Sequence, residues 1–412
     1  MCAQTRSKAQ STDCSDMNVA TIVQNHYCLG CGLCVSDTGP DKLRMTEQED
    51  GFMVPTPQDG FDCNVDSLRE YCPGVTVRLE RPLKTRVEKT YGPLLDLKVA
   101  YANDEKIRHR GSSGGCLTAI LCSLLEQGKI VGVLQAGASQ TQPTRTVYKL
   151  SKTVDEIVAN AGSRYAPSSL LVDFRNILDT CFPIAVVGKP CDIVAVRQFL
   201  THNQEHRERV YCTLSFMCMG MPSQHATTRM IRGLGIQDES EVTELKYRGD
   251  GWPGQVVART ATGGSRTCSY QDSWGRILGR DVHFRCKICP DGWGYFADIS
   301  AGDAWHTDGR GPLFDESPGR SLIFVRSERG REVIEAVARS ITFGEYDICE
   351  LPIIQKSQHA RTNRVWSSYS VLKLRGDRLL RFSGVGMWTR VFKSSPLDTI
   401  RGGIGLMRRI PR

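Results

Sequence analysis

The stretch CLGCGLC at residues 28–34 places three cysteines at intervals of three residues. A C-x2-C-x2-C run is the local half of a bacterial ferredoxin ligand set, in which the fourth cysteine usually precedes a proline. Cys72-Pro73 fits that description. Glycines between the cysteines let the backbone curl around a cube of iron and sulfide and turn its N–H groups toward the sulfurs. The run therefore predicts a 4Fe-4S cluster held by Cys28, Cys31, Cys34 and Cys72.

Two alternatives stay open for this first cysteine set. A zinc knuckle is one, although zinc sites usually combine two C-x2-C pairs, or cysteine with histidine. The other concerns the fourth ligand, because Cys63 is a rival to Cys72. The proline after Cys72 favours Cys72.

A second set of cysteines is spread along the chain. Cys286 and Cys289 form a C-x2-C pair, while Cys191 and Cys218 each follow a strand-like segment. Loops at the carboxyl ends of parallel strands converge on one crevice, so these four thiols could form a second four-thiolate site. Spacing alone leaves half a zinc ribbon, a redox dithiol or chance as alternatives.

Three further motifs are candidates for binding a nucleotide-like cofactor. A glycine-rich helix start exposes N–H donors to anions, and arginine adds a phosphate clamp. The loop at 247–254 could stack a tryptophan on a planar ring, or be a hairpin turn with a packed tryptophan. Two acidic residues, five apart, could contact a ribose or cap a helix. The candidate residues are Arg110, Ser112, Ser113, Gly114 and Gly115 at the helix start, Arg248, Gly249 and Trp252 in the loop, and Asp298 and Asp303.

The order of apolar and turn segments predicts a mixed α/β fold with a small ferredoxin-like module in front. Strands and helices alternate from about residue 97, and 241–267 resembles an antiparallel hairpin. The predicted divisions are a disordered end (1–20), the iron–sulfur module (21–92), an α/β region in two parts (93–180 and 181–345) and a basic tail (346–412).

The overall composition is typical of a globular cytoplasmic protein. The chain has 412 residues, 17 cysteines and a net charge of +8. We expect no secretory signal and no transmembrane segment, because no apolar run approaches about 18 residues. Cysteines in a reducing compartment favour metal sites over disulfides. The tail carries 13 basic and 4 acidic residues. It is compatible with a solvated end or with contact to an acidic partner or membrane surface, and we expect no nucleic-acid function.

Taken together and in this order, these motifs resemble the beta subunit family of coenzyme F420-reducing hydrogenase and dehydrogenase. The similarity spans about residues 21–345. Besides the two cysteine sets, it includes the segments 111–115, 163–165, 187–191, 218–223, 247–254 and 298–303. The same family is similar to 7-hydroxymethyl chlorophyll a reductase and divinyl chlorophyllide 8-vinyl reductase. Those enzymes have Asp between the first two cysteines, where this chain has Leu29 and Gly30, which argues against a chlorophyll substrate.

The resemblance implies FAD and one or two 4Fe-4S clusters, and it adds Ser163, Arg164 and Lys189 to the cofactor-binding residues. The expected function is an iron–sulfur flavoprotein oxidoreductase. It would pass single electrons between a ferredoxin or redox partner subunit and FAD, which exchanges a hydride with coenzyme F420 or another planar substrate. An electron-transfer subunit of a larger complex, with no substrate site of its own, and a zinc-stabilised binding protein are the alternatives. No catalytic residue is predicted, and we expect an oligomer or a complex subunit.

Overall fold

The computed structural model of the chain describes residues 18–61, 65, 68–81, 83–387, 389–390, 396–407 and 409–410. Most of the predicted disordered end and the alternative ligand Cys63 lie outside these residues. Residues 18–20 belong to the cap and start of the first helix, α1 (Val19–Gln24).

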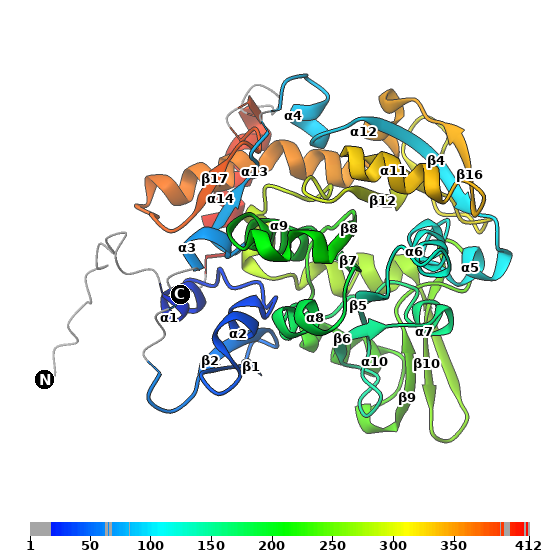
Figure 1. Ribbon diagram of the computed structural model, residues 1–412, viewed down its shortest axis with the longest axis horizontal. Helices are drawn as coiled ribbons and strands as arrows, with labels where there is room; N and C mark the ends of the chain where they lie inside the picture. Colours follow the sequence, from blue (N-terminus) through cyan, green and yellow to red (C-terminus); the bar gives the residue numbers. More distant parts are fainter. Residues whose placement is uncertain are drawn as a thin grey trace, which may run out of the picture.

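An eight-stranded mixed sheet forms the centre of the chain, in the order β16-β4-β15-β12-β8-β7-β5-β6 (Figure 1). Its middle strands β12, β8, β7 and β5 run parallel, and the outer neighbours pair antiparallel. This confirms the mixed α/β fold class. The strands are β4 (Asp96–Ala102), β5 (Gly132–Ala138), β6 (Thr146–Ser151), β7 (Ile184–Gly188), β8 (Val210–Phe216), β12 (Ile299–Asp303), β15 (Ser321–Val325) and β16 (Ile341–Glu345).

Helices cover both faces of this sheet because successive strand residues point to opposite sides. Ile184 and Val186 of β7 pack into one apolar core with α8 and α9, while Ala185 packs into the other core with α6 and α11. The helices of this region are α5 (Glu105–Arg110), α6 (Cys116–Glu126), α7 (Val154–Ala159), α8 (Phe174–Thr180), α9 (Pro190–His202), α10 (Gln224–Gly233) and α11 (Glu328–Ala336).

The first cysteine set belongs to a small module at one end of the molecule, drawn in blue in Figure 1. It contains α1, α2 (Leu33–Thr38), the hairpin β1 (Leu43–Glu47) and β2 (Met53–Pro57), and α3 (Leu68–Tyr71). The module is docked on α9, where the Gln198 amide donates to the carbonyls of Tyr71 and Thr76. The cysteine loop is also tied to the main domain, because the N–H of Leu171 donates to the Cys31 carbonyl at 2.8 Å.

The predicted hairpin at 241–267 is a three-stranded antiparallel sheet, β9 (Val242–Lys246), β10 (Gln255–Thr260) and β11 (Ser265–Ser269). Later in the chain, β13 (His306–Thr307) and β14 (Pro312–Leu313) form a short hairpin. The one-turn helix α4 (Glu88–Tyr91) comes before the first strand of the main sheet.

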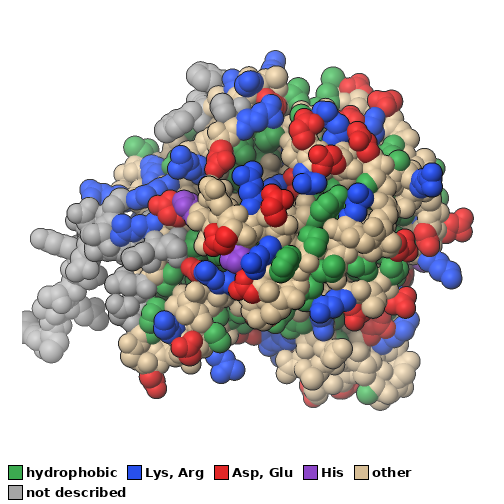
Figure 2. Space-filling model, in the orientation of Figure 1, with side chains coloured by type: hydrophobic (Ala, Val, Ile, Leu, Met, Phe, Trp, Pro, Cys, Tyr) green, Lys and Arg blue, Asp and Glu red, His purple; other side chains and the backbone are tan. Residues whose placement is uncertain are grey.

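Residues after 345 differ from the basic tail that the sequence suggested. They form α12 (Leu351–Ile354), the 19-residue helix α13 (Lys356–Leu374), β17 (Arg381–Ser383) and α14 (Pro396–Met407). β17 pairs in parallel with β3 (Thr76–Arg78), so the chain end returns to the cysteine module. Val365 and Leu372 of α13 are buried in the main core. Basic and acidic side chains are interspersed on the face shown in Figure 2.

Candidate functional site

The four thiols of the first predicted set lie together. Burial, together with the nearby Cys72, raises the pKa of Cys28 to about 12. Burial and the other three thiols raise the pKa of Cys34 well above its usual range. Four such groups disfavour ionisation of one another, so a set of four thiolates here requires a bound cation.

Backbone N–H groups in this module face the sulfurs, as the glycine spacing predicts. The N–H of Gly30 donates to the Cys28 sulfur at 3.4 Å. Backbone N–H groups of Gly74 and Val75 lower the pKa of Cys72 against the larger effect of its burial. Both glycines between the cysteines have left-handed backbone, and a Cβ at Gly30 would lie 2.6 Å from the Met53 carbonyl. Such N–H donors are the outer contacts that tune metal-bound sulfur.

The second predicted cysteine set also converges on one place. Cys191, Cys218, Cys286 and Cys289 all line a small cavity of about 20 Å³. Cys191 is in the first turn of α9 and Cys218 follows β8, so the parallel strands β7 and β8 bring them together. The other two come from a short 3-10 helix, Phe284–Ile288, and its cap. A volume of 20 Å³ holds about one water, so a cluster would require the thiol groups to turn outward.

Cations and amide donors surround this second set. The Arg361 guanidinium donates to the carbonyls of Cys218 and Cys286, at 2.8 and 3.0 Å. The Met221 N–H donates to the Cys286 sulfur at 3.4 Å. Lys189 also lines the cavity, and it pairs with Asp192 at 2.8 Å. Burial alone would lower the pKa of Lys189, but Asp192, Cys191 and Cys218 together raise that pKa above its usual value, so the ammonium group stays charged at neutral pH.

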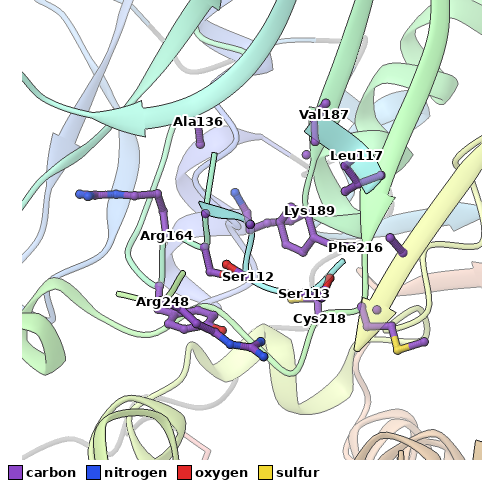
Figure 3. Close-up of a pocket in the computed structure, with 18 of the residues that line it drawn as sticks. Ser112, Ser113, Leu117, Ala136, Arg164, Val187, Lys189, Phe216, Cys218 and Arg248 are labelled. Carbon is purple, nitrogen blue, oxygen red and sulfur yellow. Dashed lines mark hydrogen bonds between the residues drawn. The ribbon is translucent and has the colours of Figure 1, made fainter. Parts of the chain in front are cut away.

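A larger cavity of about 290 Å³ lies beside the small one and shares part of its wall (Figure 3). The residues common to both cavities are Lys189, Cys218, Gly220 and Met221. A group bound in the large cavity would therefore be next to the second cysteine set.

One end of the large cavity is the predicted glycine-rich helix start. Ser112, Ser113 and Gly115 line it together with the first residues of α6, and the Ser163 hydroxyl donates to that of Ser112 at 2.9 Å. Gly115 is left-handed, with φ of 72°, and a Cβ there would lie 2.7 Å from the Ile107 carbonyl. The free N–H groups of the first turn of α6 make this end suited to an anion.

Another part of the cavity wall is aromatic and carries a buried ion pair, next to the helix start: Asp303 pairs in the sheet with Ser321, whose hydroxyl is 2.7 Å from that of Ser113. Arg248 donates both guanidinium nitrogens to the Asp303 carboxylate, at 2.9 and 2.6 Å, and lies over the rings of Tyr270 and Trp305. Tyr270, Trp274 and Trp305 line the cavity. This aromatic part of the wall suits a flat, partly apolar group.

Most of the predicted cofactor residues line this cavity. Those that do are Ser112, Ser113, Gly115, Ser163, Arg164, Lys189, Arg248 and Asp303. Arg164, however, spends its guanidinium on the carbonyls of Pro143, Arg145 and Leu245, and in Figure 3 it points away from Lys189. Arg164 therefore lines the cavity while its guanidinium is hydrogen-bonded to backbone carbonyls.

Five predicted cofactor residues are not in the wall of either cavity. Arg110 donates to the carbonyls of Val158 and Ala159 at the end of α7, and Asp298 accepts from Arg197, Thr213 and Ser327. Trp252 is buried behind Trp305, stacked on it at 4.7 Å, with its N–H on Asp303. Gly114 and Gly249 make close backbone contacts instead. These five residues build the scaffold around the cavity.

Sequence reasoning missed the contribution of the C-terminal region. Gln355 and Gln358 line the large cavity, and Arg361 lines the small one. Their spacing of three residues puts them near one face of a helix, which is the signal that could have indicated a shared role.

Two further features concern metal coordination and membrane-spanning helices. Within the described ranges, no group of three or more His, Cys, Asp or Glu residues is arranged to hold a single metal ion. Ligands of a cubane cluster each bind a different iron atom, so their sulfurs are spread more widely than around one ion. In the same ranges, no helix has the length and apolar character to cross a membrane.

Comparisons with known proteins identify the family to which this mixed sheet and these cysteine sets belong. Residues 97–173 and 183–348 match the N-terminal and C-terminal parts of the family "Coenzyme F420 hydrogenase/dehydrogenase, beta subunit". The chain belongs to this family. The match covers more than half of the 412 residues and ends before α13.

Several named relatives are redox proteins of methanogens. The chain is 26% identical over 331 residues to the coenzyme F420-dependent sulfite reductase of Methanocaldococcus jannaschii, covering 77% of this chain but 47% of that protein. It is 24% identical over 248 residues to the coenzyme F420 hydrogenase subunit beta of Methanosarcina barkeri, covering 57% of this chain and 75% of that subunit.

A solved structure supports the fold. A chain of the F420-reducing [NiFe] hydrogenase complex from Methanosarcina barkeri superposes with a TM-score of 0.54 at 20% identity. The superposition covers 71% of this chain and 97% of that one.

Proposed function

We propose that this chain is a redox subunit that binds FAD in the large cavity and a 4Fe-4S cluster at each cysteine set. The observation that carries the proposal is the wall shared by the two cavities, which includes Lys189 and Cys218. When bound, a flavin exchanges electrons singly with iron–sulfur clusters and in pairs, as a hydride, with an organic substrate.

The residues that line the large cavity include groups suited to the pyrophosphate and to the planar rings of FAD. The N–H groups of α6 and the hydroxyls of Ser112, Ser113 and Ser163 would hold the pyrophosphate. Tyr270 and Trp305 would flank a planar group, and the Arg248–Asp303 pair would hold this part of the wall in place. Lys189 brings a fixed positive charge to the side nearest the second cysteine set. It would stabilise negative charge that develops on the bound ring.

The four cysteines of each set are the donors that a 4Fe-4S cluster needs, and the two sets are close neighbours; at the second set the thiol groups would turn outward to make room. Leu29, between the first two cysteines, lines the small cavity and packs against Cys286. The two sets are thus neighbours, with the second beside the flavin cavity. The first set lies in the peripheral module, where a ferredoxin or another subunit could approach it (Figure 1). Coenzyme F420 is the substrate we propose, since it appears in the names of the relatives.

Anaerobic purification followed by assays of iron, sulfide and flavin tests this proposal. We expect broad visible absorption, FAD released on denaturation, and iron with equimolar acid-labile sulfide. Iron without flavin would indicate an electron carrier alone. Zinc without iron would overturn the redox proposal in favour of a zinc-stabilised binding protein.

A second candidate is an electron-transfer subunit without its own substrate site. Its support is that the chain spans only 47% of the sulfite reductase and that other relatives are subunits. Reduction assays with coenzyme F420 and ferredoxin, side by side on the isolated protein, separate the two. The enzyme responds to both, whereas the electron-transfer subunit responds to ferredoxin alone.

A further inference from the structure

Arg285 connects the two cysteine sets through a buried contact. Its backbone precedes Cys286 directly, and its side chain reaches the loop after Cys72. There Nε donates to the Gly74 carbonyl at 2.6 Å, and Nη2 donates to the Pro73 carbonyl at 2.9 Å. The residue is 1% exposed. One side chain thus ties a ligand loop of the first set to a ligand of the second.

Within the described residues, the guanidinium of Arg285 forms no ion pair, and the Asp377 carboxylate nearby is bonded to Tyr27 instead. The buried Nη1 of Arg285 has no hydrogen-bond partner among those residues. Its guanidinium lies 4.8 Å from the centre of the Phe382 ring. A buried cation without an ion-pair partner is strongly destabilising. The position therefore requires a source of negative charge close by.

The cysteines of both sets are close enough to supply that charge. Arg285 lowers the pKa of both Cys72 and Cys286, opposing the larger effect of burial on each. The other cations near the thiols act on one set, since Arg361 affects Cys218 and Cys286, and Lys189 affects Cys191. A cluster with four thiolates carries net negative charge, and each electron it accepts adds one more.

We propose that Arg285 is a positioning residue that raises the reduction potentials of both clusters and couples them, by placing one buried positive charge between the two cysteine sets. The inference rests on the proposed function. Transfer between the sets moves one electron, so one cluster is oxidised as the other is reduced, and no bond is made or broken. A positive charge near both favours the reduced state of each.

The test is an anaerobic redox titration of the holoprotein, followed by EPR and absorption. Arg285→Gln removes the charge and Arg285→Lys keeps it. Arg209→Gln is the matched control, because Arg209 also lies 4.8 Å from a ring, that of Phe182, and donates to a carbonyl, that of Leu178. We expect both midpoint potentials to become more negative in Arg285→Gln and to stay near the native values in the other two variants.

Unchanged potentials in a fully loaded Arg285→Gln would overturn the inference, as would equal shifts in the Lys and Gln variants. If Arg285→Gln does not load, iron content decides. If Arg285→Lys contains as much iron as the native protein, the positive charge is what matters. If Arg285→Lys loses as much iron as Arg285→Gln, the paired hydrogen bonds of the guanidinium matter instead, and the inference is overturned. Native protein lacking iron and sulfide would instead contradict the proposed function itself.

Discussion

Cys218 lies where the two cavities meet. Its surroundings show what distinguishes the proposed ligands from the other cysteines among the seventeen. Its carbonyl accepts from Arg361, and its pKa is raised to about 12 by burial and by the neighbouring Cys286. Cys122, in contrast, is buried in an apolar core with no other predicted ligand in that core. Proximity to other thiols, not burial, distinguishes the proposed ligands.

Removing one ligand from each set should separate the clusters. We expect Cys31→Ala and Cys289→Ala each to lose about half of the iron and sulfide, because a cluster missing a thiolate is held weakly. FAD should stay bound after Cys31→Ala. The control is Cys122→Ala, with native iron. Loss of FAD from Cys31→Ala, or native iron in Cys289→Ala, would contradict the assignment.

His283 predicts a specific acid sensitivity. Burial lowers its pKa from 6.5 to about 3, and its ring packs edge-on against Phe52. The folded pKa is below the unfolded value, so between pH 6.5 and 3 the unfolded state binds the extra proton. Stability present above pH 6.5 is then lost by about 1.4 kcal/mol per pH unit on acidification.

Urea unfolding at pH 6.5 and 5.0, before most carboxylates titrate, measures this loss. The free energy of unfolding should differ less between pH 6.5 and pH 5.0 in His283→Asn than in the native protein, by about 2 kcal/mol. If the free energy of unfolding changes equally with pH in the two proteins, the pKa of His283 is not lowered by folding.

At the scale of elements, α6 supplies the anion-binding end of the large cavity. Gly115→Ala would force a Cβ to within 2.7 Å of the Ile107 carbonyl at a left-handed position. We expect a loss of about 1–3 kcal/mol in stability and at least about tenfold weaker FAD binding, a cost of about 1.4 kcal/mol. Fluorescence titration of the flavin-free protein measures the second effect.

Gly128→Ala is the control at the other end of the same helix. Its φ is 64°, and a Cβ there would contact nothing within 4 Å. It should destabilise by about 1 kcal/mol and leave FAD affinity unchanged. Equal FAD affinity in Gly115→Ala and the native protein would remove α6 from the binding site.

The element α13 closes both cavities from outside the matched family region. Arg361→Gln would remove the guanidinium donor from the carbonyls of Cys218 and Cys286, and only the Cys286 carbonyl would keep another donor, the Cys289 N–H at 3.4 Å. We expect about 2 kcal/mol of destabilisation and faster loss of iron from the second set under a chelator. Arg364→Gln, an exposed residue on the same helix, should behave as native. Equal chelation rates in the two variants would refute the role of α13.

These elements also show what the sequence could reveal. Cys191 and Cys218 were predictable as neighbours because they follow adjacent parallel strands, whose carboxyl ends meet. The alternation of strands and helices from about residue 97 was equally clear from the order of apolar and turn segments. The role of α13 was hidden, because arginines and serines dilute its apolar positions. The sequence could not show that Trp305 rather than Trp252 lines the cavity, because only tertiary packing decides which of the two stacked rings faces it.

At the scale of the whole molecule, three regions far apart in sequence meet at one site. The N-terminal module brings Leu29, the α/β domain brings Lys189 and Cys218, and the C-terminal helix brings Arg361. The order is cysteine module, second cysteine set, large cavity. In the function proposed above, that order would give single electrons a path to a two-electron cofactor.

EPR of the chemically reduced, anaerobic holoprotein tests whether two clusters lie close together, which is the central claim. Two neighbouring reduced clusters are paramagnetic and split each other's lines, so we predict a broadened composite spectrum. In Cys31→Ala it should simplify to the signal of a single cluster. A native spectrum of one isolated cluster, identical with and without Cys31, would contradict the arrangement of two coupled centres.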